Sequence, residues 1–479
     1  MHKMISVRTA SLLSRAVSRS PVPPYPIVSF LSVKEVGNLF LVEKSINESI
    51  IKGLLKCFSD RHTCFNTSIS TAVTTQHLAI MKGLDRSIRF FGPMPSPRWA
   101  PLSTQLPAGF TLGGFGGNCN EIAYSIVYLS ENPANRQPLV AAGVHNQLSA
   151  LLIDQQATAR AKQWAAEALG NLSRDPANHP TLMEARVHNQ LSALLSDSQA
   201  TALAKQWAAG ALCNLSADPV NSPILVAAGV HNPLSALLSD PQATALAKQW
   251  AAVALGDLSR DPDNVQPLVE AGVHNPLSEL LSDPHATPEA KQWAILALGN
   301  LSADLANLQA LVDAGVHNQL SALLRDPQAT PLAKEYAAWV LFNLSIDDIN
   351  LKPLFVAKVH ISLGRSLLSD GDATPDAKEW AIKVLFNLSS DDAYSDRLVA
   401  AGVHIQLSAL LSDPLATPLA KECAVGALGN LSLDPANLPI LVAAGVHNQL
   451  SALLSDLQAT PWVKQWAAGA LGNLSLDPG

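Results

Sequence analysis

The fold is decided by a stretch of 43 residues, PVNSPILVAAGVHNPLSALLSDPQATALAKQWAAVALGDLSRD at 219–261, because close copies of it fill most of the chain. Its histidine, its tryptophan (replaced by Tyr336 and Cys423 in two copies) and its (G/C/F)-(N/D)-L-S phrase each recur every 43 residues. One interval is 44 residues, for the histidines that between His360 and His404. Eight units follow, from Pro133–Asp175 (unit 1) to Pro435–Asp477 (unit 8), and the extra residue lies between His360 and Trp380. Self-similarity at this period is typical of solenoids.

Each unit predicts three helices. In 219–261 we expect a short helix over 222–228 that ends at Gly229, a second over 232–238, and a longer third over 244–259. No stretch alternates with a period of two, so we expect no strands. Stacked three-helix units make an α-solenoid. The apolar side of the third helix should be buried, and it consists of Ala247, Ala251, Ala254, Leu255 and Leu258.

The order of a short helix, Ala-Gly, a Leu-rich helix and an Ala-rich helix ending in A-L-x-N-L-S resembles the armadillo repeat, over residues 133–479. The resemblance implies an all-α, right-handed superhelix of eight armadillo-type three-helix repeats. Residues 121–138 look like a degenerate third helix with Tyr128 at the asparagine position. We therefore interpret 118–132 as a degenerate N-terminal capping repeat.

The first 117 residues differ in composition from the repeats. Residues 1–34 hold five basic residues and no acid, which is typical of a transit peptide, although a disordered tail or a misassigned start would look the same. Residues 35–91 include a capping box at Ser45–Glu48 followed by apolar residues at helical spacing, so one short helical segment of unknown role is expected. Residues 92–117, rich in Pro and Gly, are interpreted as a linker.

Composition narrows the class of protein. The 479 residues are 48% hydrophobic and carry a net charge of −7. Residues 133–479 hold 19 Lys/Arg against 32 Asp/Glu, a net charge of −13, which disfavours nucleic acid as a partner. Five scattered cysteines predict neither disulfides nor a zinc site, and no apolar run reaches the roughly 20 residues of a membrane span. We expect a cytoplasmic protein, with organelle import through the basic N-terminus as the alternative.

The repeated histidines do not predict a metal site. Neighbouring repeats lie about 8–10 Å apart, whereas zinc ligands lie about 2.0–2.1 Å from the ion. Neighbouring histidines therefore cannot share one ion, and no cysteine or carboxylate pair accompanies each of them. We expect structural residues at the turn between the first and second helices, no metal and no cofactor.

The asparagines of the third helices are the main candidates for binding. An amide side chain can pair with a peptide N–H and C=O together, and the armadillo resemblance implies that these residues hold an extended peptide by its backbone. In the alternative, they bond the backbone of the neighbouring repeat. Gly or Ala beside most of them would let a ligand backbone approach closely. The series is Asn171, Asn214, Asn300, Asn343, Asn387, Asn430 and Asn473, with Asp257 in unit 3.

Units 5 and 6 add aromatic and cationic side chains to this series. The tryptophan seven residues before each asparagine is assigned to packing between repeats or, alternatively, to a half-exposed aromatic platform. Nuclear-import adaptors of the armadillo family place Trp four residues before Asn, and here only unit 5 does so, which disfavours a basic nuclear-localisation ligand along the whole groove. Partner selectivity is predicted at Tyr336, Trp339, Phe342, Asn343, Trp380, Lys383, Phe386 and Asn387.

We therefore predict a non-enzymatic scaffold that binds an extended segment of another protein along its third helices. The alternatives are an armadillo subunit that recruits substrates for ubiquitination and a membrane-associated adaptor of the vacuolar type. No capping helix follows unit 8, so we expect Leu450, Leu453 and Leu454 to be partly uncovered, and either a homodimer through this end or a truncated gene model. Arg186 and Lys358 replace the glycine after the first helix and should mark weak turns.

Overall fold

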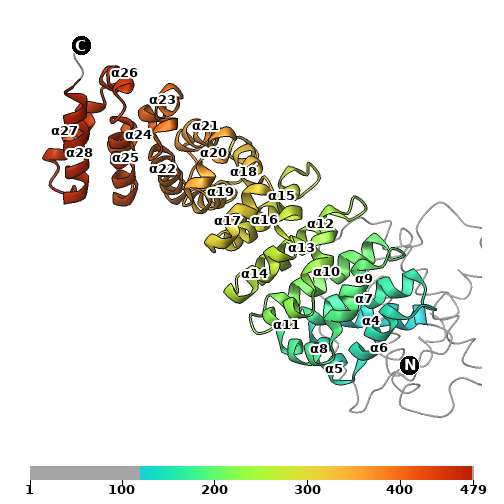
Figure 1. Ribbon diagram of the computed structural model, residues 1–479. Helices are drawn as coiled ribbons and strands as arrows, with labels where there is room; N and C mark the ends of the chain where they lie inside the picture. The colour runs from blue at the N-terminus through green and yellow to red at the C-terminus, as the bar shows by residue number, and fades with distance from the viewer. Residues whose placement is uncertain (1–118, 477–479) are drawn as a thin grey trace, which may run out of the picture. The chain divides into compact units, whose positions relative to one another are not determined.

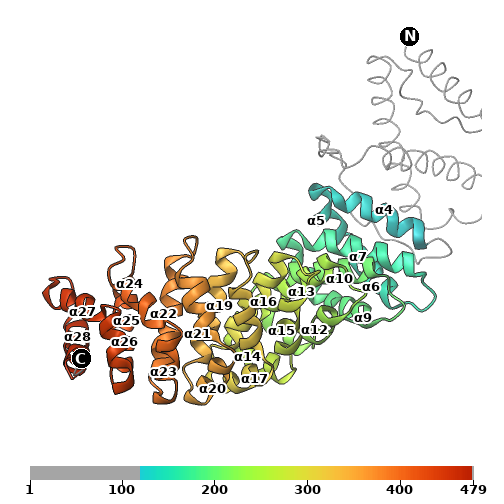
Figure 2. The same ribbon diagram turned by 90° about the horizontal axis from the view of Figure 1, so that it is seen from above.

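The computed structural model describes residues 119–476, and these form an all-α solenoid of eight armadillo-type three-helix repeats preceded by one capping helix (Figure 1). No strand occurs among the described residues. The units follow one another in a single row from α4 to α28, as the second view also shows (Figure 2). The segments predicted over 1–34, 35–91 and 92–117 lie outside the described residues.

The capping helix is α4 (Cys119–Glu131), and each unit then contributes a first, a second and a third helix in chain order. Unit 2 also begins with a short 3-10 turn. The helices of units 1 to 4 are α5 (Pro133–Ala141), α6 (Val144–Ile153) and α7 (Ala159–Ser173); η2 (Pro176–Asn178), α8 (His179–Glu184), α9 (Val187–Ser196) and α10 (Ala202–Ser216); α11 (Ser222–Ala227), α12 (His231–Ser239) and α13 (Ala245–Leu258); α14 (Pro262–Glu270), α15 (His274–Ser282) and α16 (Pro288–Leu301).

Units 5 to 8 repeat this order, with a change in the second helix of unit 6. Their helices are η3 (Leu305–Asn307), α17 (Leu308–Asp313), α18 (Val316–Leu324) and α19 (Pro331–Leu344); α20 (Asp348–Val356), α21 (Val359–Ile361), η4 (Ser362–Leu368) and α22 (Pro375–Ser389); α23 (Asp392–Ala400), α24 (Val403–Leu411) and α25 (Pro418–Leu431); η5 (Pro435–Asn437), α26 (Leu438–Ala443), α27 (Val446–Ser455) and α28 (Pro461–Leu474).

The third helices form the spine of the solenoid, because each packs on the third helix before it, from α4 and α7 through to α25 and α28. Each begins at a threonine whose side chain accepts a hydrogen bond from a backbone N–H of the first turn, as Thr244 does from Ala247 at 3.0 Å. The apolar side predicted for unit 3 is buried, with every one of its five residues at most 1% exposed. The three predicted helices of this unit are confirmed to within one residue at each end.

The N-terminal cap is shorter than the predicted segment 121–138. The chain breaks at Asn132, which has extended backbone angles and caps α5 by accepting from the N–H of Ala134. Residues 133–138 therefore belong to the first helix of unit 1. Helix α4 still acts as a third helix, because its Ser130 accepts a hydrogen bond from Asn171 of unit 1 at 3.2 Å.

Polar contacts hold successive third helices together near their N-terminal ends. In six of the seven interfaces between units, the capping threonine donates to a Gln or Glu side chain of the unit before it, as Thr244 donates to Gln206 at 2.7 Å. A lysine of the same turn forms an ion pair with the aspartate that follows the next unit's second helix. These pairs measure 2.7–3.1 Å, and they are Lys162–Asp197, Lys205–Asp240, Lys248–Asp283 and Lys334–Asp370.

The extra residue of unit 6 lies in its second helix. Residues Ser362–Leu368 form the π-helical segment η4, where the other units have a regular α-helix. A π-helical turn holds one more residue than an α-helical turn. The insertion predicted between His360 and Trp380 is therefore absorbed within the helix, and the third helix α22 keeps its place in the stack.

The turn between the first and second helices requires a left-handed backbone. Glycine occupies it in six units, with φ between +72° and +83°, and Arg186 and Lys358 occupy it with φ of +53° and +58°. Both side chains have a Cβ atom, so the conformation is strained as predicted.

We expect Arg186→Gly to raise the free energy of unfolding by about 1 kcal/mol, because glycine adopts positive φ without that strain. Guanidinium denaturation of the variant measures it. The matched change Gly229→Ala, which introduces the same strain, should lower stability by a similar amount. Equal stability of Arg186→Gly and the parent chain would contradict the assignment of strain to this turn.

The C-terminal repeat is covered better than expected. Leu450 and Leu453 are 0% and 6% exposed, so the prediction that they would be uncovered is wrong, because α28 of the same unit packs over them. Leu454 is 38% exposed, whereas its counterpart Leu411 in unit 7 is 6% exposed. The unpartnered surface of unit 8 therefore begins at Leu454.

Within residues 119–476, no single helix is long and apolar enough to cross a membrane. Two sharply bent pairs reach that length and composition only together, Pro288–Leu301 with Leu305–Asp313 and Pro435–Ala443 with Val446–Ser455.

Candidate functional site

The candidate site is the row of asparagines and tryptophans along the third helices, which we call the third-helix face. The asparagines lie in the last turns of these helices, and the tryptophans lie about two turns earlier. All of the tryptophans in this row are half-buried, as are most of the asparagines, while Asn171 and Asn343 are 2% and 8% exposed. The face thus presents partly covered amides and rings at a regular spacing.

The asparagines bond the neighbouring repeat, which favours the alternative that the sequence left open. The side-chain N–H of each donates to a serine hydroxyl of the preceding unit at 2.9–3.2 Å, and only Asn214 also reaches a neighbouring carbonyl, that of Gly170 at 3.3 Å. The acceptors are therefore hydroxyls rather than backbone. In order along the chain they are Ser130, Ser173, Ser259, Ser302, Ser345, Ser389 and Ser432.

Each of these serine hydroxyls also donates a hydrogen bond to the backbone carbonyl three residues earlier, as Ser302 does to Gly299 at 2.7 Å. The amide oxygen of each asparagine has no hydrogen-bond partner among the described residues. Half of each amide is therefore used for joining repeats. In the half-buried asparagines the oxygen is left for a ligand N–H, whereas Asn171 and Asn343 are buried. Sequence reasoning missed the serines, although N-L-S recurs as a unit and could have suggested the pair.

The glycines beside the asparagines serve the tryptophan rings and do not open the face to a ligand. A Cβ atom placed on Gly170, Gly256 or Gly429 would lie 3.1, 2.8 or 2.6 Å from the tryptophan ring of the next unit. Gly472 in the last unit, which no further ring covers, has nothing within 4 Å. The expectation that glycine lets a ligand backbone approach is therefore wrong for these covered units. Packing between repeats, one of the two roles considered for the tryptophans, is confirmed.

Unit 3 interrupts the series. Its Asp257 has no side-chain N–H to donate, so the hydroxyl of Ser216 receives no hydrogen bond from it. That hydroxyl only donates to the backbone carbonyl of Cys213 at 2.9 Å. Burial raises the pKa of the Asp257 carboxyl, and Arg260 at 3.4 Å opposes that shift. The interface between units 2 and 3 therefore lacks the asparagine–serine bond that joins the other units.

The residues predicted to confer selectivity in units 5 and 6 lie together in part. The rings of Phe342 and Trp380 are 5.1 Å apart, and the Lys383 ammonium lies 4.0 Å from the centroid of Trp380. Lys383 also forms an ion pair with Glu379 at 2.8 Å, so it is not the free cation that the sequence suggested. An acidic ligand side chain would have to displace this carboxylate.

The remaining members of the predicted cluster face their neighbouring repeats. The ring of Trp339 covers Gly299 of unit 4, and the ring of Phe386 covers Gly426 of unit 7. Tyr336 is half-buried and makes no ring contact with these residues. Only Phe342, Trp380 and Lys383 therefore contact one another, while Trp339 and Phe386 pack outward against units 4 and 7.

Two hollows open on the third-helix face. One, of about 430 Å³, lies in units 7 and 8 and is lined by Trp466, Gly469 and Asn473 among others. The other, of about 120 Å³, lies between units 1 and 3 and is lined by Trp207, Trp250, Asn214 and Arg174. Both combine an amide with indole rings, which suits a peptide segment that offers backbone groups and apolar side chains.

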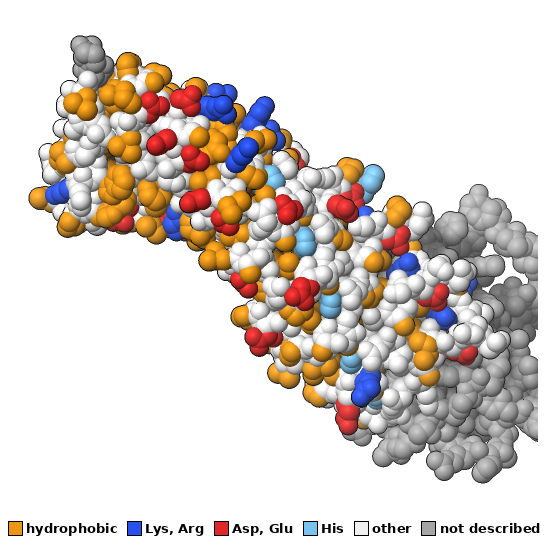
Figure 3. All heavy atoms as spheres, viewed as in Figure 1, with side chains coloured by type: hydrophobic (Ala, Val, Ile, Leu, Met, Phe, Trp, Pro, Cys, Tyr) orange, Lys and Arg blue, Asp and Glu red, His pale blue; other side chains and the backbone are white. Residues whose placement is uncertain are grey.

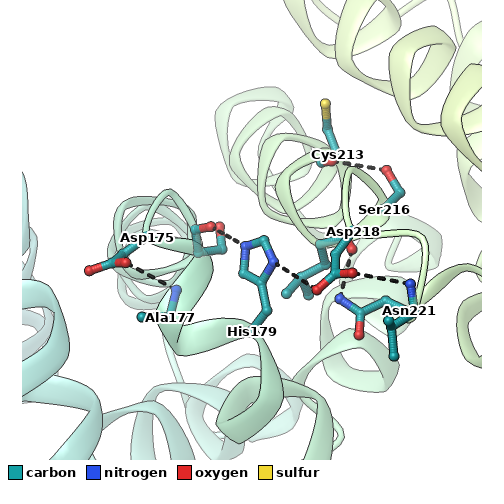
Figure 4. Close-up of polar contacts among 10 residues, drawn as sticks. Asp175, Ala177, His179, Cys213, Ser216, Asp218 and Asn221 are labelled. Carbon is teal, nitrogen blue, oxygen red and sulfur yellow. Dashed lines mark hydrogen bonds and ion pairs between the residues drawn. The ribbon is translucent and has the colours of Figure 1, made fainter.

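No arrangement for covalent chemistry emerges from the described polar residues. His179 is the best-connected histidine, with its ring 2.8 Å from the carbonyl oxygen of Ser173 and 4.0 Å from Asp218 (Figure 4). Ser216 donates elsewhere, and burial raises the pKa of the Cys213 thiol to about 12. Among residues 119–476 no group of three His, Cys, Asp or Glu side chains could hold a metal ion.

Comparison with known proteins supports the fold. An engineered protein of known crystal structure superimposes with a TM-score of 0.51 at 23% sequence identity, over 74% of this chain and 95% of its own. A designed armadillo repeat protein gives a TM-score of 0.43 at 25% identity, over 51% of this chain and 99% of its own. Another, solved with the peptide (KR)4, gives 0.43 at 25% identity, over 51% and 98%. No protein-family model and no curated protein sequence matches the chain.

Proposed function

We propose that this chain is a non-enzymatic scaffold that binds an extended segment of another protein along the third-helix face. The observation that carries the proposal is the row of unpaired amide oxygens beside half-buried indole rings. An extended peptide exposes a backbone N–H at regular intervals, and each N–H needs an acceptor when the peptide is desolvated. The asparagine oxygens supply such acceptors, and the hollows beside Trp207 and Trp466 accommodate side chains.

The direction of the hydrogen bonds that the asparagine amides make refines this proposal. Because the asparagine N–H is committed to a serine of the preceding unit, the ligand is held mainly through its own N–H groups. Selectivity is proposed to come from Trp339, Phe342 and Trp380, because no other unit has a ring at the position of Trp339 and most units have Gly at the position of Phe342, whose ring contacts Trp380. Lys383 contributes through its position on Trp380, with its charge already balanced by Glu379.

The test is a binding measurement on the full chain with a peptide selected from a random 20-residue library. Trp339→Ala should weaken binding by about 2 kcal/mol, roughly thirtyfold, if this ring anchors the ligand. Asn343→Ala should weaken it by about 1–3 kcal/mol through loss of the acceptor. The matched control is Leu296→Ala, at the position of Trp339 in unit 4, which should change affinity far less.

Stability must be followed in the same variants, because Asn343 also bonds Ser302. Guanidinium denaturation separates loss of the ligand contact from loss of the fold. Affinity that is unchanged in Trp339→Ala and Asn343→Ala but abolished by changes in units 1 or 8 would place the ligand elsewhere. Failure to select any peptide would contradict the scaffold function itself.

Three further proposals remain open to experiment. Location in the cytoplasm is proposed because the cysteines are scattered along the sequence, which suits a reducing compartment. A homodimer through unit 8 follows from the exposed Leu454, and sedimentation at several concentrations tests it. Recruitment of substrates for ubiquitination and association with a vacuolar membrane are the alternative settings for the same scaffold.

A further inference from the structure

A second surface stands out on the first and second helices of units 6 and 7. Four exposed cations gather there, Lys352 on α20, Lys358 in the turn that follows, Arg365 on η4 and Arg397 on α23. We call these four residues the outer cationic patch. Figure 3 shows Lys and Arg side chains gathered over this part of the solenoid, whereas they are scattered over the rest of the visible face.

Three of the four cations have no cationic counterpart in any other unit. The other units carry Gln, Pro or Asp at the position of Lys352, and Ala or Glu at the position of Arg365. The position of Lys358 holds Gly in six units and Arg186 in unit 2. The counterparts of Arg397 are Pro, Thr, Ile or Ala. In near-identical repeats of an acidic protein, four such changes on one surface concentrate positive charge.

The patch is built on a rigid aromatic base. Phe355 stacks between His360 and Tyr394, with ring centroids 4.2 and 4.5 Å apart. The Arg397 guanidinium lies over Phe355 at 5.9 Å, which places α23 beside α20. This stack joins the elements that carry three of the four cations. The π-helical segment η4, also confined to unit 6, carries the fourth.

Apolar side chains lie exposed among the cations. Val356 is 71% exposed, one turn after Lys352, where the other units have Ala, Glu or Asp. Ile405 on α24 is 55% exposed where most units have Asn. Helix α24 lies beside η4, since Gln406 is the side chain nearest to Gly364. The surface is therefore both cationic and apolar.

The charge of the patch is not neutralised from within the described residues. Among the described residues, none of the four cations has a carboxylate within 4.0 Å, whereas five lysines of the third helices form ion pairs. Asp396, next to Arg397 in the chain, turns its side chain to the backbone N–H of Arg397 at 2.7 Å. The four cations are thus available to a partner.

We propose that the outer cationic patch binds an acidic segment of another protein that also carries an aromatic or aliphatic side chain. Carboxylates of the segment would pair with the four cations, and its apolar side chain would cover Val356 and Ile405. Nucleic acid and anionic membranes are disfavoured, because the net charge of −13 on residues 133–479 repels an extended anionic surface. A short acidic peptide segment interacts only with the positive charge of the patch itself. This surface is separate from the third-helix face.

The test uses the full chain and a phage-displayed library of random 12-residue peptides, with the enriched sequence made as a labelled peptide. The key variant is Lys352→Gln/Lys358→Gly/Arg365→Ala/Arg397→Ala, in which each change introduces a residue that other units hold at that position. It should bind the peptide at least tenfold more weakly. Raising KCl from 50 to 300 mM should weaken the parent complex at least threefold. The matched control Arg186→Gly, a cation in the same turn of unit 2, should leave affinity unchanged.

Several results would overturn the proposal. These are enriched peptides without an excess of Asp and Glu, equal binding by the fourfold variant, or binding that Trp339→Ala abolishes and the fourfold variant does not. Patch-dependent binding to vesicles of phosphatidylcholine and phosphatidylserine at 7:3, without competition by the peptide, would assign the surface to membranes instead. If the fourfold variant fails to fold, Lys352→Gln/Arg365→Ala provides the same test, because it alters neither the turn nor the ring stack.

Discussion

Between pH 6.5 and about 4 the repeats should lose much of their folding stability. The cause is the series of buried histidines at the start of the second helices. Burial lowers the pKa of seven of them below the ordinary value of 6.5, and the Nδ1 atom of each has no hydrogen-bond partner. They are His145, His188, His231, His274, His317, His360 and His404.

The direction of the effect follows from proton binding. Above pH 6.5 these histidines are neutral in both folded and unfolded chains, so they do not change stability with pH. Below pH 6.5 the histidines of the unfolded chain bind protons, whereas the buried histidines of the folded chain stay neutral. This difference favours unfolding. For His360, whose pKa burial and Lys358 lower to about 4, the loss amounts to about 2–3 kcal/mol by pH 4. The other six add to it in the same direction.

Denaturation in guanidinium at pH 7.5, 6.5, 5.5 and 4.5 measures this loss. His360→Gln should reduce the dependence on pH, because its side chain does not titrate. Stability that is constant from pH 6.5 to 4.5 would show that the histidines accept protons without unfolding. A second, separate loss is expected below pH 4, where Asp197, Asp283 and Asp370 are protonated. Hydrogen bonds hold the pKa of these carboxyls below its ordinary value; the largest contribution comes from the backbone N–H of Gln199 at Asp197 and from the paired lysine at Asp283 and Asp370.

The second large effect concerns the pair Phe386 and Cys423. At the other covered positions of this kind, a glycine before the asparagine usually accommodates a tryptophan ring of the next unit. Between units 6 and 7 the sizes are reversed, with Phe386 at the glycine position and Cys423 at the tryptophan position. The ring of Phe386 reaches Gly426 of unit 7. At this interface the earlier unit therefore supplies the ring, whereas at most of the other interfaces the later unit supplies it.

We expect Phe386→Gly to cost about 2–3 kcal/mol through the cavity that it leaves, and Cys423→Trp to cost about 1–3 kcal/mol through overpacking against Phe386. The double variant should recover at least about 2 kcal/mol of the summed loss, because it recreates the pair Gly429 and Trp466. Equilibrium denaturation of the four chains gives the coupling energy. Additive losses would mean that the two side chains pack independently.

The repeat fold could be predicted from the sequence because its signals are local. The period of 43 residues, the threonine caps and the apolar face of residues such as Ala251 and Leu255 need no knowledge of how units stack. The positive φ of Arg186 and Lys358 followed from the glycine at this turn in the other units. Each of these features can be predicted from the sequence of a single repeat, without its neighbours.

Contacts between units were harder to predict. That Asn343 would meet Ser302, 41 residues earlier, depends on the angle between stacked helices, which one unit does not determine. The same holds for the tryptophan ring on Gly429 and for the covering of Leu450 by α28. Lys383 was expected to face a ligand because its position varies among units, but variation also arises where a residue pairs within its own helix, as Lys383 does with Glu379.

The absence of the asparagine–serine bond at Asp257 has a mechanical consequence. Most interfaces between third helices are fastened near both ends, by threonine or lysine contacts at one end and by asparagine and serine at the other. Between units 2 and 3 only the first fastening is present, through Thr244 and Lys205. If the solenoid is regarded as an elastic rod, the missing bond should lower its bending stiffness at this joint, which separates arms of two and six repeats.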